Sequence, residues 1–144
     1  MLRTSLAVVV GVILGAGGFA LAHLHDEPGH GKVTVLSERD VVETLGGELA
    51  RVTTVEVAYE PGEASVPHRH AGPIFGYVLE GEYELGLEAD SPKRLKAGET
   101  FYEPAGILHR VSRNPSTKNR TRLLAVHLHA RSAKDLTVPA SISQ

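Results

Sequence analysis

Short apolar segments alternate with turn residues along the chain from residue 32 onward. Seven segments rich in Val, Leu, Ile, Tyr and Thr predict β-strands, and they cover residues 32–36, 49–59, 75–79, 82–88, 100–103, 107–111 and 122–130. Glycine and proline separate these segments, as at Gly46 and Gly62. Only residues 37–45 favour a short helix, with Ser37 as its N-cap. Evenly spaced short strands with such turns predict an all-β sandwich or a closed barrel.

The segment at residues 75–79 differs from its neighbours because apolar side chains occupy both of its faces. This pattern is typical of a strand that is buried on both sides. We expect that a second subunit covers one of these faces.

The first 22 residues have the pattern of a secretory signal peptide. Arg3 is followed by an uncharged, mostly apolar run that ends in the small residues Ala20 and Ala22, which predicts cleavage before His23. The protein is therefore expected to be exported, to a periplasm or to the medium. The alternative is an uncleaved anchor, the one case that would place the protein at a membrane, but the run is short for a span and rich in glycine.

The rest of the chain divides into three parts. Residues 23–31 predict a flexible leader that contains three histidines, residues 32–131 a single barrel domain, and residues 132–144 a C-terminal tail. A length of 144 residues fits one domain. The formal net charge is −2 and no basic stripe is present, so we expect no nucleic-acid partner. The sequence contains no cysteine, which excludes disulfides, thiolate metal sites and a cysteine nucleophile.

Three histidines, two in an extended run that follows the Pro61-Gly62 turn and one in a predicted strand, indicate a metal site. His68 and His70 are two residues apart, so in a strand both imidazoles point to the same face. His109 follows in a later strand. Three imidazoles on one side of an ion leave coordination positions open on the other side, as a catalytic metal site requires. Imidazole suits Fe, Zn, Mn, Ni and Cu alike, so these ligands do not distinguish the divalent metal.

These histidines and the glycines around them resemble the cupin superfamily. The first motif of that family fits Gly62, His68, His70 and Gly81, and the second fits Gly98, Pro104, Gly106 and His109. The resemblance implies a single-domain, all-β, cupin-type jelly-roll barrel, also called a double-stranded β-helix. It also implies a homodimer, because small cupins resemble one another in pairing their barrels.

The chain departs from the family pattern at two positions. Ile74 stands where the family has a glutamate ligand, and Asn114 comes one residue later than the family asparagine, whose place Arg113 takes. The expected site is therefore three neutral imidazoles, alone or with a ligand still to be identified. Glu103 could replace the missing carboxylate, but its place just before the Pro104 turn favours solvent exposure. His127 and His129 are expected at the barrel rim.

The resemblance leaves several functions open. Some cupins that use three histidines without the carboxylate activate dioxygen, which implies a metal-dependent, dioxygenase-like enzyme that acts on a small molecule. A non-catalytic module that binds a small ligand or a metal is the alternative, because fold alone does not determine function. A third possibility is metal buffering by the barrel site together with the leader. No residue is assigned a catalytic role beyond metal binding.

Overall fold

The computed structural model describes residues 31–140. The predicted signal peptide at residues 1–22 lies outside this range, and so does the predicted leader apart from Gly31. Every regular element in residues 31–140 is a β-strand. Within that range, no helix is long and apolar enough to cross a membrane.

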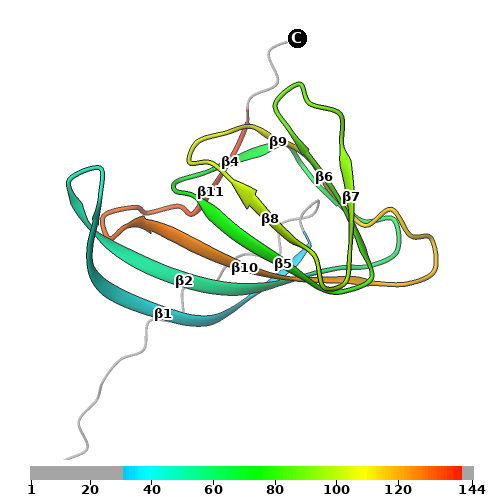
Figure 1. The fold of residues 1–144 in the computed structure, drawn as a ribbon, viewed down its shortest axis with the longest axis horizontal. Helices are drawn as coiled ribbons and strands as arrows, with labels where there is room; N and C mark the ends of the chain where they lie inside the picture. The colour runs from blue at the N-terminus through cyan, green and yellow to red at the C-terminus, as the bar shows by residue number, and fades with distance from the viewer. Residues whose placement is uncertain (1–30, 141–144) are drawn as a thin grey trace, which may run out of the picture.

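Eleven strands form two antiparallel sheets that curve around a common interior (Figure 1). The first sheet has the order β1-β2-β10-β5-β8. Its strands are β1 (Lys32–Leu45), β2 (Glu48–Tyr59), β10 (Thr121–Ala130), β5 (Ile74–Glu80) and β8 (Thr100–Glu103). The second sheet has the order β11-β4-β9-β6-β7, and β3 pairs with β9 beside that path. Its strands are β11 (Thr137–Pro139), β4 (His68–His70), β9 (His109–Arg113), β6 (Glu82–Leu87), β7 (Lys93–Lys96) and β3 (Ala64–Ser65).

The core lies between the two sheets because each strand buries alternate side chains. Along β10, buried and half-buried residues alternate over the whole strand, as expected when one face of a sheet meets the interior. The main cluster combines residues from both sheets: Tyr59, Val78, Tyr83, Leu85 and Leu123. A smaller cluster contains Val55, Ile74 and Ala125.

The helix predicted at residues 37–45 is wrong, because this segment is the second half of β1. Val41, Val42 and Thr44 are β-branched, which favours an extended chain. The segment also pairs with β2 through a hairpin that turns at Gly46 and Gly47, both with positive φ. Pairing with β2 along the hairpin gives this segment backbone hydrogen bonds, whereas an isolated helix of nine residues would be only marginally stable in water.

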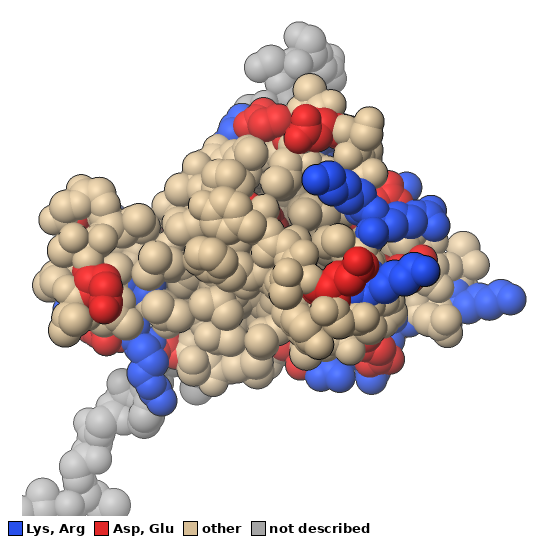
Figure 2. Space-filling model, in the orientation of Figure 1, with Lys and Arg blue, Asp and Glu red and all other residues tan. Residues whose placement is uncertain are grey.

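The outer face of β5 is not buried by any described residue of this chain. Phe75 is 53% exposed and Tyr77 is 40% exposed, whereas Ile74 and Val78 are fully buried. The prediction that both faces of this strand are buried is therefore wrong for a single copy of the chain. Figure 2 shows a largely uncharged surface over β5 and β8, whereas charged side chains gather over β6 and β7.

Asn114 lies one residue past β9 and is 1% exposed. Its amide nitrogen donates to the backbone oxygens of Tyr59, Glu60 and Asn119, and its Oδ1 accepts from the Ser116 amide. Although Asn114 is displaced by one residue from the family position, its side chain hydrogen-bonds both to the end of β2 and to the loop that follows β9.

The chain beyond residue 131, assigned to a C-terminal tail by sequence, returns to the barrel. β11 pairs with β4 in the register Thr137 to His70 and Pro139 to His68. The Ala71 amide donates to the oxygen of Leu136. This segment therefore belongs to the folded unit and borders the histidines of β4.

Candidate metal centre

The structure brings His68, His70 and His109 together inside the barrel. β4 supplies His68 and His70, and His109 is the direct partner of His68 on β9. The ring centroids of His68 lie 4.7 Å from those of both His70 and His109. One nitrogen from each of the three residues falls within 4.8 Å of the others. These three residues would therefore be able to hold one divalent ion.

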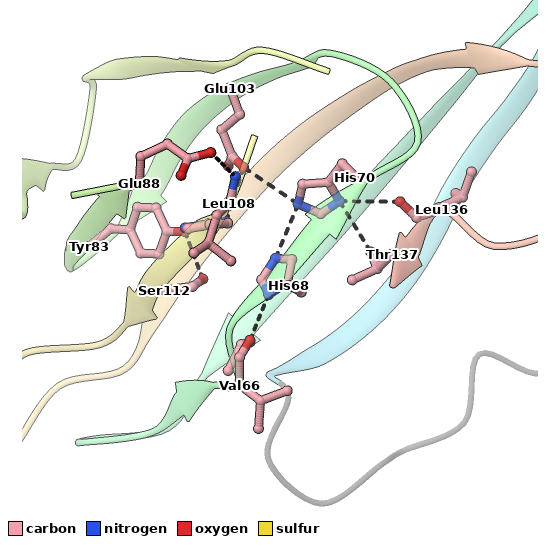
Figure 3. A network of polar contacts seen from close by, with 12 residues as sticks. Val66, His68, His70, Tyr83, Glu88, Glu103, Leu108, Ser112, Leu136 and Thr137 are labelled. Atoms are coloured by element: carbon pink, nitrogen blue, oxygen red, sulfur yellow. Dashed lines mark hydrogen bonds and ion pairs between the residues drawn. The ribbon is translucent and has the colours of Figure 1, made fainter. Parts of the chain in front are cut away.

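Backbone carbonyls determine which nitrogen of each β4 histidine faces the interior. His68 Nδ1 donates to the oxygen of Val66 at 2.8 Å, and His70 Nδ1 to the oxygen of Leu136 at 3.3 Å. A carbonyl can only accept, so Nε2 of His68 carries a lone pair when its ring is neutral. His70 Nδ1 also lies 3.2 Å from the Thr137 hydroxyl, which can donate or accept. The two Nε2 atoms lie 3.2 Å apart (Figure 3), so one ring can donate to the other or both can bind one cation.

Burial keeps these rings neutral and therefore able to bind a metal. Burial, together with the charge of His109, lowers the pKa of His68 to about 4. Burial also lowers the pKa of His70, although the nearby Glu103 carboxylate opposes this effect. Neutral imidazole is the form that binds a metal ion.

Glu103 is part of this cluster, and the expectation that it faces solvent is wrong. It is 2% exposed and lies directly opposite Ile74 on the neighbouring strand. Its Oε2 lies 3.0 Å from His109 Nδ1 and 3.5 Å from His70 Nε2. Burial alone would raise the pKa of the carboxyl, but the close approach of His109 and the charges of His70 and His68 outweigh it, so the pKa is lowered. The sequence held a signal: in residues 100–103, Glu103 shares its face with Phe101.

Two buried atoms of the cluster are left without a hydrogen bond. Among the described residues, Glu103 Oε2 and His109 Nδ1 are the buried side-chain atoms that lack one. They face each other at 3.0 Å but are not oriented for hydrogen bonding. Buried polar atoms are nearly always satisfied in folded proteins, so such a pair points to a missing partner. A divalent cation would satisfy both atoms, and the Nε2 atoms of His68 and His70 lie close enough to bind the same ion, so the residues present fit a metal ion.

His127 and His129 are buried, although we expected them at the rim. His127 lines the interior, and its ring lies 5.2 Å from that of His70. Burial and the charge of His70 lower the pKa of His127 to about 4. His129 lies 2.9 Å from the hydroxyl of Thr53. β2 continues beside the end of β10, where Thr53 pairs with His127 and Arg51 pairs with His129, so both histidines lie within the sheet rather than at its rim.

A chain of hydrogen-bonded hydroxyl groups contacts His109 at its Nε2 atom. The Tyr83 hydroxyl lies 3.2 Å from His109 Nε2 and 2.8 Å from the Ser112 hydroxyl. Ser112 also contacts the Tyr59 hydroxyl at 2.8 Å, and Tyr59 contacts Ser65 at the same distance. Burial raises the pKa of both tyrosines, so they are neutral near pH 7. Sequence reasoning missed this chain because its members come from four strands and share no motif.

The cluster opens into a cavity of about 290 Å³ between the sheets. Most of its wall is apolar, with Val55, Ile74, Phe101, Leu123 and Ala125 among the residues that form it. The polar groups gather at the histidine end. No lysine or arginine is among the described residues that line the cavity, so its walls offer no fixed positive charge to a ligand.

Comparisons with known proteins agree with this architecture. The sequence model of the cupin domain matches residues 55–127, about half of the chain. The chain is 36% identical over 81 residues to germin-like protein subfamily 2 member 4 of Arabidopsis thaliana, covering 52% of this chain and 34% of that protein. It is 33% identical over 84 residues to oxalate oxidase 1 of Hordeum vulgare, covering 53% of this chain and 42% of that protein. The chain thus matches less than half the length of these relatives.

Solved structures show the same fold. A Klebsiella pneumoniae protein with a double-stranded β-helix domain superposes with a TM-score of 0.59 at 19% identity, covering 81% of this chain and 90% of that one. A recombinant oxalate oxidase in complex with glycolate gives a TM-score of 0.58 at 24% identity, covering 79% of this chain and 57% of that one. The prediction of an all-β, cupin-type jelly-roll barrel is confirmed.

Proposed function

Because the chain belongs to the cupin domain family, we propose that it is a metal-dependent, dioxygenase-like oxidoreductase that acts on a small molecule. His68, His70 and His109 are the proposed ligands of one divalent ion, which can be Fe, Zn, Mn, Ni or Cu. The observation that carries this proposal is the convergence of three histidine nitrogens within 4.8 Å of one another, next to two buried atoms, Glu103 Oε2 and His109 Nδ1, that lack a hydrogen bond. Packing alone does not account for such an arrangement, whereas a shared cation does.

The similarity to oxalate oxidase 1 supports oxidation of an oxygen-bearing substrate. A bound divalent ion would polarise an oxygen atom of the substrate and offer it an open coordination position. The residues that line the cavity would determine which substrate fits. Since its lining combines a polar histidine end with apolar walls, the proposed substrate has one oxygen or sulfur donor group and a compact apolar body.

The residues of this chain prepare the site before a substrate arrives. The carbonyl of Val66 fixes the tautomer of His68, and the Leu136 carbonyl and Thr137 hydroxyl hold Nδ1 of His70. Tyr83 holds the far side of His109. Such partners orient metal ligands and increase their basicity. The apolar wall excludes water from the reacting end, which strengthens electrostatic interactions there.

Metal analysis and turnover assays test this proposal in two steps. Elemental analysis of the mature protein should give about one divalent metal per chain, and His68→Ala should lose it. Anaerobic loading with each of the five metals should then give O₂ consumption with an enolic, thiol or phenolic substrate. No metal in the wild-type protein would refute the proposal. A stoichiometric metal without turnover, with a small molecule recovered unchanged that raises the melting temperature, would instead establish the non-catalytic binding module.

We also propose that the protein is exported and assembles as a homodimer. Export is supported by the pattern of residues 1–22. Sequencing of the protein isolated from the periplasm or medium should find His23 at its N-terminus, whereas Met1 would refute cleavage. The dimer is supported by the exposed apolar side chains of β5 and β8, since large exposed apolar patches mark association surfaces.

A further inference from the structure

We infer that Glu103 is the fourth protein ligand of the metal, so that the centre consists of three histidines and one carboxylate. This inference rests on the proposed metal site and adds to it a ligand from β8. The carboxylate would thus enter the site from the strand beside Ile74 rather than from position 74 itself.

The pairing of β5 and β8 explains how a carboxylate reaches the histidines from this position. Ile74 is directly opposite Glu103 on one side and His127 on the other. Directly opposed residues in antiparallel strands point to the same face of the sheet. Glu103, Ile74 and His127 therefore form a row that faces the interior, and all three are nearly fully buried. Glu103 and Ile74 are consequently the two adjacent positions from which one carboxylate can reach the cluster.

Three distances between polar side-chain atoms of the cluster match those between neighbouring ligands of one ion. Two atoms each about 2.1 Å from a metal lie about 3.0 Å apart at a right angle and about 3.4 Å apart at a tetrahedral angle. Glu103 Oε2 lies 3.0 Å from His109 Nδ1 and 3.5 Å from His70 Nε2. His70 Nε2 in turn lies 3.2 Å from His68 Nε2. Figure 3 shows His70 between Glu103 and His68, with both contacts on the ring edge opposite Leu136.

Glu103 has no permanently charged partner among the described residues. Its ion-pair contacts are with His70 and His109, which carry a charge only when protonated, and neither lysine nor arginine is among the described residues that line the cavity. Its Oε2 is buried without a hydrogen bond. A buried carboxylate is stable only when it is paired or coordinates a metal. A divalent cation beside Oε2 supplies that charge.

A purely orienting role for Glu103 fits the contacts of His109 less well. In that role, His109 Nδ1 would donate to Glu103 and Nε2 would bind the metal. His109 Nε2, however, faces the Tyr83 hydroxyl at 3.2 Å on the side away from Glu103. Nδ1 is the nitrogen that faces the carboxylate and lacks a hydrogen bond. The contacts therefore place Nδ1 and Oε2, together, on the metal side.

Titrations with Co²⁺ against a competing chelator test the inference on the full mature chain. The variants are Glu103→Gln, which keeps the shape and removes the charge, and His68→Ala, which reports on the site itself. Glu82→Gln at the start of β6, where the side chain is 42% exposed, is the matched control. We expect Glu103→Gln to weaken Co²⁺ binding more than about 100-fold, beyond the range for a lost supporting hydrogen bond. Its visible Co²⁺ spectrum should also change, while Glu82→Gln binds like the wild type.

Exchanging the residues at positions 74 and 103 tests whether the carboxylate acts as a metal ligand or only orients His109. The double variant Ile74→Glu/Glu103→Ile should recover Co²⁺ affinity to within about tenfold of the wild type, because opposed positions share a face. Ile74→Glu alone should not tighten binding, since the carboxylate position is already filled. Near-ultraviolet circular dichroism of each metal-free variant establishes that it is folded before its affinity is compared.

The possible failures are distinguishable. Wild-type affinity and an unchanged spectrum in Glu103→Gln, with binding lost in His68→Ala, would overturn the ligand role of Glu103 and leave the proposed metal site intact. The same conclusion follows if Glu103→Gln weakens binding without a spectral change while Ile74→Glu alone tightens it. If the wild type binds no metal, both the inference and the proposed function fall.

Discussion

The Tyr83 hydroxyl lies 3.2 Å from Nε2 of His109 and connects this ring, through Ser112, to Tyr59 on the opposite sheet. Tyr83 is 1% exposed, so these contacts lie in the middle of the main core cluster. The orientation of one proposed metal ligand therefore depends on the packing of the barrel, and substitutions behind the site should affect metal binding.

Removing the Tyr83 hydroxyl should weaken metal binding without removing a ligand. Tyr83→Phe keeps the ring in the core but leaves His109 and Ser112 with one partner fewer. We expect metal affinity to fall about 10- to 100-fold, as for other groups that support a ligand. Stability of the metal-free protein should fall by about 1–3 kcal/mol, because buried polar atoms lose a hydrogen bond. Chelator competition and urea unfolding measure the two effects. Tyr102→Phe on the exposed face is the control, and equal effects in both variants would contradict this explanation.

Acid should destabilise the metal-free protein over a defined pH range. Burial lowers the pKa of His68 and His127 from 6.5 to about 4. Between these pH values the unfolded chain binds more protons than the folded one, so the free energy of unfolding decreases as the pH falls. Above about pH 6.5 both histidines are neutral in the folded and in the unfolded chain. This contribution to stability is then fully present, and the titration of these two residues should no longer change the free energy of unfolding with pH.

Urea unfolding of the chelator-treated protein at pH 7.5, 6.5, 5.5 and 4.5 measures this dependence. The double variant His68→Gln/His127→Gln should show a smaller decrease between pH 6.5 and 4.5 than the wild type. Identical slopes for the two proteins would show that these histidines are not buried as neutral groups. Metal saturation should extend this dependence to lower pH, since a metal bound only to the folded state opposes protonation of His68 there while the unfolded chain still binds the proton.

Filling the cavity should reduce ligand binding while leaving the metal in place. Ala125 lies in the apolar wall and is 7% exposed. Ala125→Leu adds three carbon atoms to a cavity of about 290 Å³. We expect affinity or kcat/KM for the small molecule to change by at least about tenfold, the effect of small changes in an apolar pocket. Metal content should stay at the wild-type value. Ala97→Leu on the surface is the control, and loss of the metal in Ala125→Leu would mean that the substitution disturbs the histidines.

Charge placed on the exposed face of β5 should prevent dimer formation. Phe75 is 53% exposed, and its ring lies 5.2 Å from that of Tyr102 on β8. If this face pairs with a second copy, Phe75→Lys should shift sedimentation equilibrium from dimer to monomer, because an unpaired charge is costly in an apolar interface. Val42→Lys, at an 86% exposed position of β1, is a matched control that should leave the dimer intact. A monomeric wild type, or a dimeric Phe75→Lys, would exclude this interface.

Local spacing predicted most of the fold and the histidine part of the site. Five of the seven predicted segments match a strand to within one residue at each end, because alternation and glycine turns are properties of neighbouring residues. His68 and His70 were predictable for the same reason. The main local error, the helix at residues 37–45, arose because the pairing partner β2 stabilises an extended chain that short-range signals left undecided.

The amino-acid order by itself determined an all-β chain, its turns, and a pair of imidazoles on one face of one strand. Only the tertiary structure decided that Glu103 stands inside the barrel opposite Ile74, that His127 faces the same interior, and that residues 137–139 close the sheet beside the histidines. The physical reason is that side-chain direction within a strand follows from period-two geometry, which is local. The groups that meet across strands depend on register and closure, which join residues far apart in the chain.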